Sequence, residues 1–143
     1  MDFNKMTAQD MRDFWHVVPE SSRLMRDNIS ESVWLALHNT CAGANFTVPK
    51  HSQRRCARKW GQLASVLGEE GTQQLAHHYG GEVLQVPVLR AVHVVQRSRW
   101  LRRRFQELTT QQGMKPGAAV LALCIELNAA GQPMTARQIM ASL

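Results

Sequence analysis

The stretch AGANFTVP, residues 42–49, aligns without gaps on GGEVLQVP, residues 80–87, at an offset of 38 residues. Both copies have glycine in second place, an apolar fifth residue and a final Val-Pro pair. Phe, Thr and Val favour strands, and proline ends a strand because it has no N–H to donate to a neighbour. Each copy therefore predicts a glycine turn followed by a short strand that ends at proline.

The repeat extends upstream, where Glu31 and Leu37 align on Glu69 and Leu75. A short strand cannot satisfy its backbone groups alone and needs a pairing partner. The two copies could pair with each other, or each could pair with its symmetry mate across a dimer. Two copies are too few for a solenoid. A chance similarity between two glycine-rich turns is the remaining interpretation.

Most of the chain has helical periodicity. Met11, Phe14, Trp15 and Val18 are spaced i, i+3, i+4, i+7, which predicts a helix capped by Thr7. We interpret this apolar stripe as core or as a dimer seam. Further helices are predicted over residues 21–28, 30–40, 52–67, 69–79, 90–112, 117–130 and 136–143.

Three features refine this pattern of helices. Gly68 predicts a break between the two central helices, and the helix over 90–112 is expected to kink near Arg97 and Ser98. Residues 117–130 are apolar almost all round, which predicts burial in the domain or in an oligomer. The fold class is therefore mainly α, with about seven helices and one or two short strands.

The charge of the chain is concentrated in its middle. The 143 residues carry a net charge of +6, divided into −2 over residues 1–49, +8 over 50–104 and zero over 105–143. A basic middle within a neutral or acidic frame indicates a polyanionic partner, and a solvated basic face is the alternative. Arginine suits phosphates and guanine edges better than lysine. The candidate DNA-binding residues lie on two helices, and they are Arg54, Arg55, Arg58, Lys59, Arg97, Arg99, Arg102, Arg103 and Arg104.

Residues 63–71 (LASVLGEEG) and 75–81 (LAHHYGG), followed by a strand ending in Val86-Pro87, resemble the Mor transcription-activator family of Mu-like phages and related mobile elements. The resemblance covers residues 60–108 or so, and members share the Gly-Gly pair and the apolar strand ending in Ile/Val-Pro. It implies an intertwined homodimer of helices and a short strand that presents helix-turn-helix units to promoter DNA. Most members have a basic residue after the strand proline, a place held here by Val88 and, in the first copy, by Lys50.

From these observations we expect one domain over residues 1–143. Residues 1–49 would form a helical dimerisation or packing region, 50–108 a basic Mor-like core, and 109–143 the C-terminal helices. The expected function is activator-like transcriptional regulation in a phage or mobile element, by a homodimer that binds double-stranded DNA. The neutral region after Arg104, and a last helix that ends where a recognition helix would begin, favour the alternative. That alternative is a protein-interaction module that binds a host regulator or an RNA polymerase subunit.

Other function classes have little support. The carboxylates of the basic middle are limited to Glu69, Glu70 and Glu82, and no GxSxG, P-loop or HExxH motif occurs, so we expect no enzyme and no cofactor. His77 and His78 are adjacent and diverge on a helix, so no metal site is expected. One tyrosine and four phenylalanines offer few platforms for stacking the bases of a single strand, which disfavours RNA binding or packaging.

The expected location is the cytoplasm. The three cysteines form no CxxC pair and no even framework, which indicates a reducing compartment. The longest apolar run, residues 118–125, is eight residues, and about 18 are needed to cross a bilayer. The polar start of the chain is unlike a secretory signal.

Overall fold

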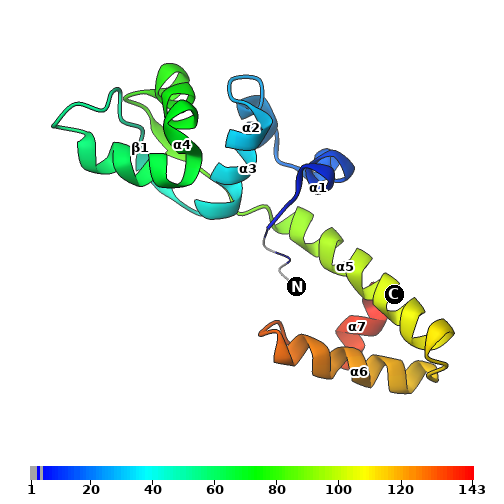
Figure 1. Cartoon of the computed structure of the whole chain (residues 1–143). Helices are drawn as coiled ribbons and strands as arrows, with labels where there is room; N and C mark the ends of the chain where they lie inside the picture. The colour runs from blue at the N-terminus through cyan, green and yellow to red at the C-terminus, as the bar shows by residue number, and fades with distance from the viewer. Residues whose placement is uncertain (1–2, 4) are drawn as a thin grey trace. The chain divides into compact units, whose positions relative to one another are not determined.

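The computed structural model describes residues 3 and 5–143 and is mainly helical, with one small antiparallel sheet among these residues (Figure 1). The elements, in chain order, are α1 (Ala8–Asp13), the 3-10 turn η1 (Trp15–Val17), α2 (Glu20–Met25), α3 (Glu31–Thr40), β1 (Asn45–Thr47), α4 (Ala57–Tyr79), β2 (Val83–Gln85), α5 (Arg90–Gln106), the π-helical turn η2 (Glu107–Gln111), α6 (Pro116–Ala129) and α7 (Ala136–Ser142).

The described residues fall into two compact units, an N-terminal unit within residues 4–92 and a C-terminal unit within residues 1–3 and 93–143. Each unit has its own hydrophobic core. Trp34, Leu37 and Leu75 are fully buried in the first, and Leu101 and Leu123 in the second. The regions expected from the sequence divide at 49/50 and 108/109, and they stay a prediction.

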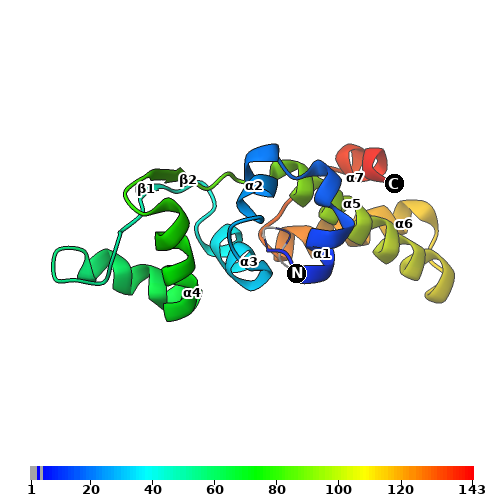
Figure 2. The same ribbon diagram turned by 90° about the horizontal axis from the view of Figure 1, so that it is seen from above.

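The two copies of the repeat pair with each other within one chain (Figure 2). Phe46 of β1 lies opposite Leu84 of β2, and these two residues are equivalent in the repeat. The flanking hydrogen bonds are equivalent as well: Gly43 N–H donates to Val86 O at 2.7 Å, and Gly81 N–H donates to Val48 O at 2.8 Å. Both glycines have left-handed backbone, with φ of 82° and 83°. The β1–β2 pair therefore has an internal two-fold relation, and the strand pairing needs no second chain.

The helices that precede the strands follow the same two-fold relation. α3 corresponds to the second half of α4, and their equivalent residues Leu37 and Leu75 are both 0% exposed. The equivalent residues Val33 and Gly71 meet, since a Cβ built on Gly71 would lie 2.9 Å from Val33 Cγ2. The missing side chain lets the two helices approach closely.

The predicted break at Gly68 is confirmed, because this residue has φ 78° and ψ 165° and divides α4 into two helical segments. The predicted start at Ser52 is wrong, since α4 begins at Ala57. A turn in which Cys56 N–H donates to Gln53 O at 2.8 Å takes the place of the first helical turns. Arg54 and Arg55 consequently lie in this turn and not on the helix.

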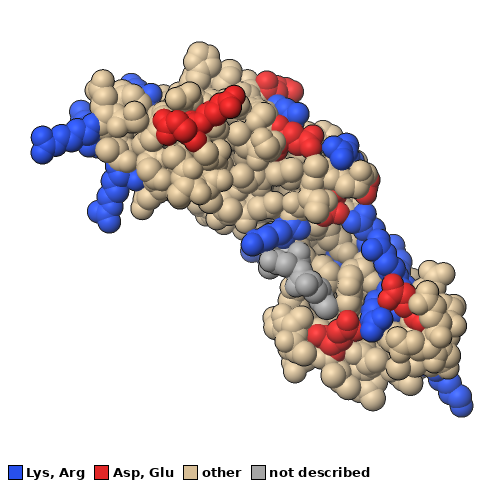
Figure 3. All heavy atoms as spheres, in the orientation of Figure 1, with Lys and Arg blue, Asp and Glu red and all other residues tan. Residues whose placement is uncertain are grey.

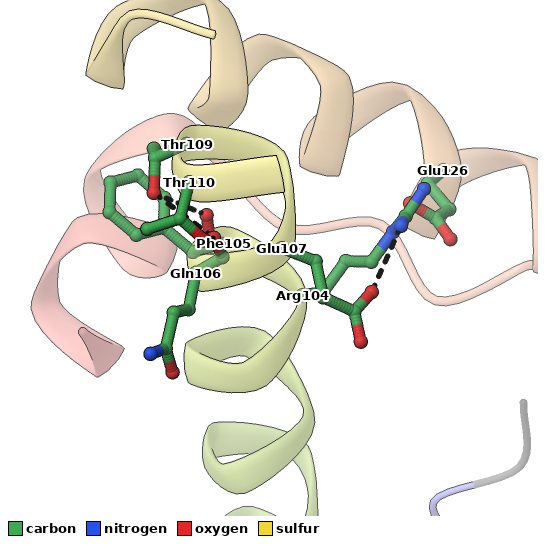
Figure 4. Close-up of polar contacts among 7 residues, drawn as sticks. All are labelled: Arg104, Phe105, Gln106, Glu107, Thr109, Thr110 and Glu126. Carbon is green, nitrogen blue, oxygen red and sulfur yellow. Dashed lines mark hydrogen bonds and ion pairs between the residues drawn. The ribbon is translucent and has the colours of Figure 1, made fainter. Parts of the chain in front are cut away.

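Helix ends elsewhere depend on local capping. Thr7 caps α1, as predicted. Thr135 caps α7, and each of the two threonines forms a capping box with the side chain three residues on. α5 is continuous through Arg97 and Ser98, so the predicted kink is wrong. The irregular segment is η2, where Thr109 Oγ1 donates to Phe105 O at 2.9 Å and Thr110 Oγ1 to Gln106 O at 2.5 Å (Figure 4). Such bonds from hydroxyls to the preceding turn distort helices.

In the C-terminal unit, α7 contacts both α5 and α6 (Figure 1). α6 buries Leu123 and Leu127 completely, whereas Leu121 and Ile125 are 61% and 63% exposed. The C-terminal unit therefore buries only part of this helix, and the predicted burial of the rest in an oligomer stays a prediction. No helix in the described part of the chain is both long enough and apolar enough to cross a membrane.

A buried polar network in the N-terminal unit joins α2 to α3. The ring of His38 stacks on Trp34 with centroids 3.9 Å apart, and Trp34 Nε1–H donates to Ser22 O at 2.7 Å. His38 Nδ1 lies 2.9 Å from Trp34 O, which can only accept, so Nδ1 carries the proton and Nε2 accepts from Ser22 Oγ at 3.0 Å. Burial lowers the pKa of His38 below its ordinary value, against the raising effect of the bond to Trp34 O.

This network predicts that the free energy of unfolding falls as the pH drops below about 6.5, the ordinary pKa of histidine. The unfolded chain binds a proton there while the native His38 stays neutral, so protonation favours the unfolded state. Urea unfolding between pH 5 and 8 measures the effect, with His38→Gln as the comparison. A pH dependence that is the same in both proteins would contradict the assignment to His38.

Candidate nucleic-acid interface

Five cationic side chains gather where the β1–α4 connection meets the start of α4. β1 ends at Thr47, two residues before Pro49, and a turn at residues 53–56 precedes the start of α4. All five side chains are exposed, and Figure 3 shows Lys and Arg projecting from this end of the N-terminal unit. We call them the basic cluster: Lys50, Arg54, Arg55, Arg58 and Lys59.

The basic cluster borders a pocket of about 400 Å³. Lys50, Arg55 and Lys59 line it, together with His51 and the backbone around Thr47. Lys59 Nζ donates to Thr47 O at 3.1 Å, which holds its ammonium at the pocket wall. No aspartate or glutamate is among the described residues that line this pocket. The arrangement thus presents several cations to one concave surface.

Charges in the basic cluster are not neutralised by the protein. Among the described residues, no ion pair or side-chain hydrogen bond engages Lys50, Arg54, Arg55 or Arg58. A nearby carboxylate, Glu69, borders a neighbouring pocket of about 330 Å³ and accepts from Trp60 Nε1 at 3.1 Å. Because exposed cations without partners attract polyanions, this surface is the strongest candidate for binding nucleic acid.

The predicted arginines of α5 belong to the C-terminal unit and have different surroundings. Arg104 donates through Nη1 to Glu107 Oε2 at 3.1 Å and through Nε to Glu126 Oε2 at 3.2 Å (Figure 4). These hydrogen bonds, the one to Glu107 above all, raise the pKa of Arg104. Its charge is thus balanced by two carboxylates, and the side chain connects α5 to α6.

The other four predicted arginines of α5 differ in exposure. Arg102 is exposed and donates through Nε to Ser142 O at 3.2 Å, and Arg103 is exposed as well. Arg97 and Arg99 are half-buried, and Arg97 Nε is buried without a hydrogen-bond partner. Arg102 and Arg103 are therefore the residues of this group most accessible to a large ligand.

Arg54, Arg55, Arg58 and Lys59 were predicted on one helix, but only Arg58 and Lys59 lie on α4, and their role in DNA binding stays a prediction. Two neighbours, Lys50 and His51, were not among the predicted site residues, yet both line the pocket. The signal for Lys50 was its place after the strand proline. The described residues contain no group of three or more His, Cys, Asp and Glu side chains that could hold a metal ion.

No protein-family model, curated protein or solved structure matches this chain. The site is therefore interpreted from its own geometry and charge.

Proposed function

We propose that this protein is an activator-like transcriptional regulator of a phage or mobile element that binds duplex DNA through the basic cluster. The observation that carries the proposal is the gathering of five exposed cations at one end of the N-terminal unit, four of them without an ion pair or side-chain hydrogen bond among the described residues. The resemblance to the Mor family adds the expectation of promoter DNA as the partner.

Fluorescence anisotropy with duplex fragments from the neighbourhood of the gene tests this proposal. We expect selective binding relative to a scrambled duplex, with affinity that falls steeply as salt rises, because phosphate contacts release counterions. Absence of binding at low salt would overturn the proposal. Equally weak binding to both duplexes would mean that the basic cluster attracts DNA without sequence selectivity, and it would contradict a role in promoter recognition.

Helix-turn-helix character, implied by the same resemblance, would belong to α6 and α7, which are joined by a turn at Gly131 with φ 73°. α7 carries a single basic residue, Arg137. We therefore assign the main phosphate contacts to the basic cluster and not to α7.

We further propose that the protein acts as a homodimer through α6. Leu121 and Ile125 lie one helical turn apart and are both largely exposed, which is the pattern of a helix that packs against a partner. Leu121→Glu with Ile125→Glu is expected to convert a dimer into a folded monomer, because two charges cannot be buried in an apolar seam.

Light scattering coupled to size-exclusion chromatography measures this change. Val66→Glu, at an exposed apolar residue of α4, is the control and should leave the dimer intact. A double variant that remains dimeric would contradict the role of α6.

The apolar surface of α6 also favours a second candidate function, a protein-interaction module for a host regulator or RNA polymerase subunit. A wild-type protein that is monomeric and recovers one such partner in stoichiometric amount after nuclease treatment would favour this function. Loss of that partner in the Leu121→Glu, Ile125→Glu variant would place its binding surface on α6.

A further inference from the structure

We propose that the pocket beside the basic cluster is a phosphate site, in which Lys50, Arg55 and Lys59 bind one phosphate group. The inference rests on the proposed function and identifies the occupant as a backbone phosphate of the bound duplex. In this proposal, three of the five cations contact one particular phosphate. The other two, Arg54 and Arg58, only add to the positive electrostatic potential around it.

The donors suit an oxyanion. Arg55 offers a planar guanidinium that can engage two phosphate oxygens, and among the described residues it has no competing carboxylate. Lys59 uses one of its three N–H groups on Thr47 O, which leaves two for a ligand. Arg54 and Arg58 are exposed but are not among the residues that line the pocket. We therefore assign a phosphate contact to Arg55, which lines the pocket, and none to its neighbour Arg54, which does not.

Gly81 positions the third donor. A Cβ at this residue would lie 2.5 Å from Lys50 Cε, so the lysine stem passes directly over the bare glycine backbone. The equivalent glycine, Gly43, faces Val88 with 3.4 Å to Cγ2. The packing of a side chain over glycine is therefore repeated by the two-fold relation, but only the first copy places an ammonium there.

Only the first copy of the repeat builds this site. The residues equivalent to the three proposed donors Lys50, Arg55 and Lys59 are Val88, His93 and Arg97, so the second copy has an apolar side chain in place of the first donor and no guanidinium in place of the second. One chain thus offers one phosphate site of this kind.

The first test compares Arg55→Ala with Arg54→Ala, two variants that remove the same charge from adjacent residues. The salt dependence of duplex binding is expected to fall by about one unit of slope in Arg55→Ala and in Lys50→Met, because each loses a phosphate contact. Lys50→Met keeps the stem over Gly81 and removes only the ammonium. Affinity should fall about tenfold or more in both variants, and the change in Arg54→Ala should be smaller.

Gly81→Ala and Gly43→Ala test the positioning of Lys50. Both place alanine in left-handed backbone, which residues with a Cβ rarely adopt, so both variants carry the same backbone strain. Only Gly81→Ala also displaces the lysine stem, so it alone should reproduce the binding loss of Lys50→Met. Equal DNA affinity in the two glycine variants would overturn the role of Lys50.

The second test uses inorganic phosphate alone, titrated at constant ionic strength and followed through amide resonances. Shifts are expected at residues 47, 48, 50, 51, 55–59 and 81 of the wild type, and not in Arg55→Ala. Shifts without any DNA binding would support the pocket and overturn the DNA-binding function. DNA binding with equal losses in Arg54→Ala and Arg55→Ala, and no phosphate shifts, would overturn the pocket and leave the function standing.

Discussion

Replacing Arg54, Arg55 and Arg58 together with glutamate is expected to abolish duplex binding at moderate salt, with a loss of at least about 100-fold in affinity. The three guanidinium groups are exposed, and among the described residues they have no carboxylate partner, so their field reaches the ligand. Their removal should also lower the salt slope by at least about one unit, which is the contribution of the phosphate contact proposed for Arg55. Anisotropy at several salt concentrations measures both quantities, and circular dichroism checks that the helices persist.

The matched control is the triple replacement of Arg99, Arg102 and Arg103 by glutamate, which changes the net charge by the same amount. We expect a smaller loss, because Arg99 is half-buried and Arg102 already donates to Ser142 O. The sequence alone predicts DNA contacts for these arginines as much as for Arg54, Arg55, Arg58 and Lys59. If the α5 variant loses binding and the basic-cluster variant retains it, the main contact surface is α5.

Much of the fold was predictable because its signals are local. The break at Gly68 and the caps at Thr7 and Thr135 depend on residues within one helical turn of each other. The strands were predictable from β-forming residues followed by proline. In the same region, a helix start at Ser52 was predicted, but the turn closed between Gln53 and Cys56 delays the helix to Ala57. Local propensity does not decide between two such competing starts.

Pairing between distant segments was not predictable in the same way. The repeat showed that two strands need partners, but pairing within a chain and pairing across a dimer satisfy the same hydrogen bonds. The register, with Phe46 opposite Leu84, settles the choice within this chain. Arg104 illustrates the same limit for the site, because its partner Glu126 is distant in sequence and becomes a neighbour only when α6 packs near α5.

Truncating either of two equivalent core residues, Leu37→Ala or Leu75→Ala, is expected to lower the free energy of unfolding by about 2–5 kcal/mol. Both side chains are 0% exposed in the N-terminal unit, so each truncation loses apolar burial and leaves a cavity. Since a domain is stable by only about 5–15 kcal/mol, the double variant should leave this unit largely unfolded at 37 °C.

Tryptophan fluorescence during urea unfolding measures these effects, in a Trp100→Phe background that leaves only the tryptophans of the N-terminal unit, Trp15, Trp34 and Trp60. Leu24→Ala, at a residue of the same unit that is 57% exposed, should change the free energy of unfolding by less than about 0.5 kcal/mol. Burial alone predicts that each truncation is destabilising. The two-fold relation predicts in addition that the two losses are similar, because Leu37 and Leu75 are equivalent residues of one shared core. A large loss from one truncation and almost none from the other would mean that the repeat is matched in backbone geometry but not in energy.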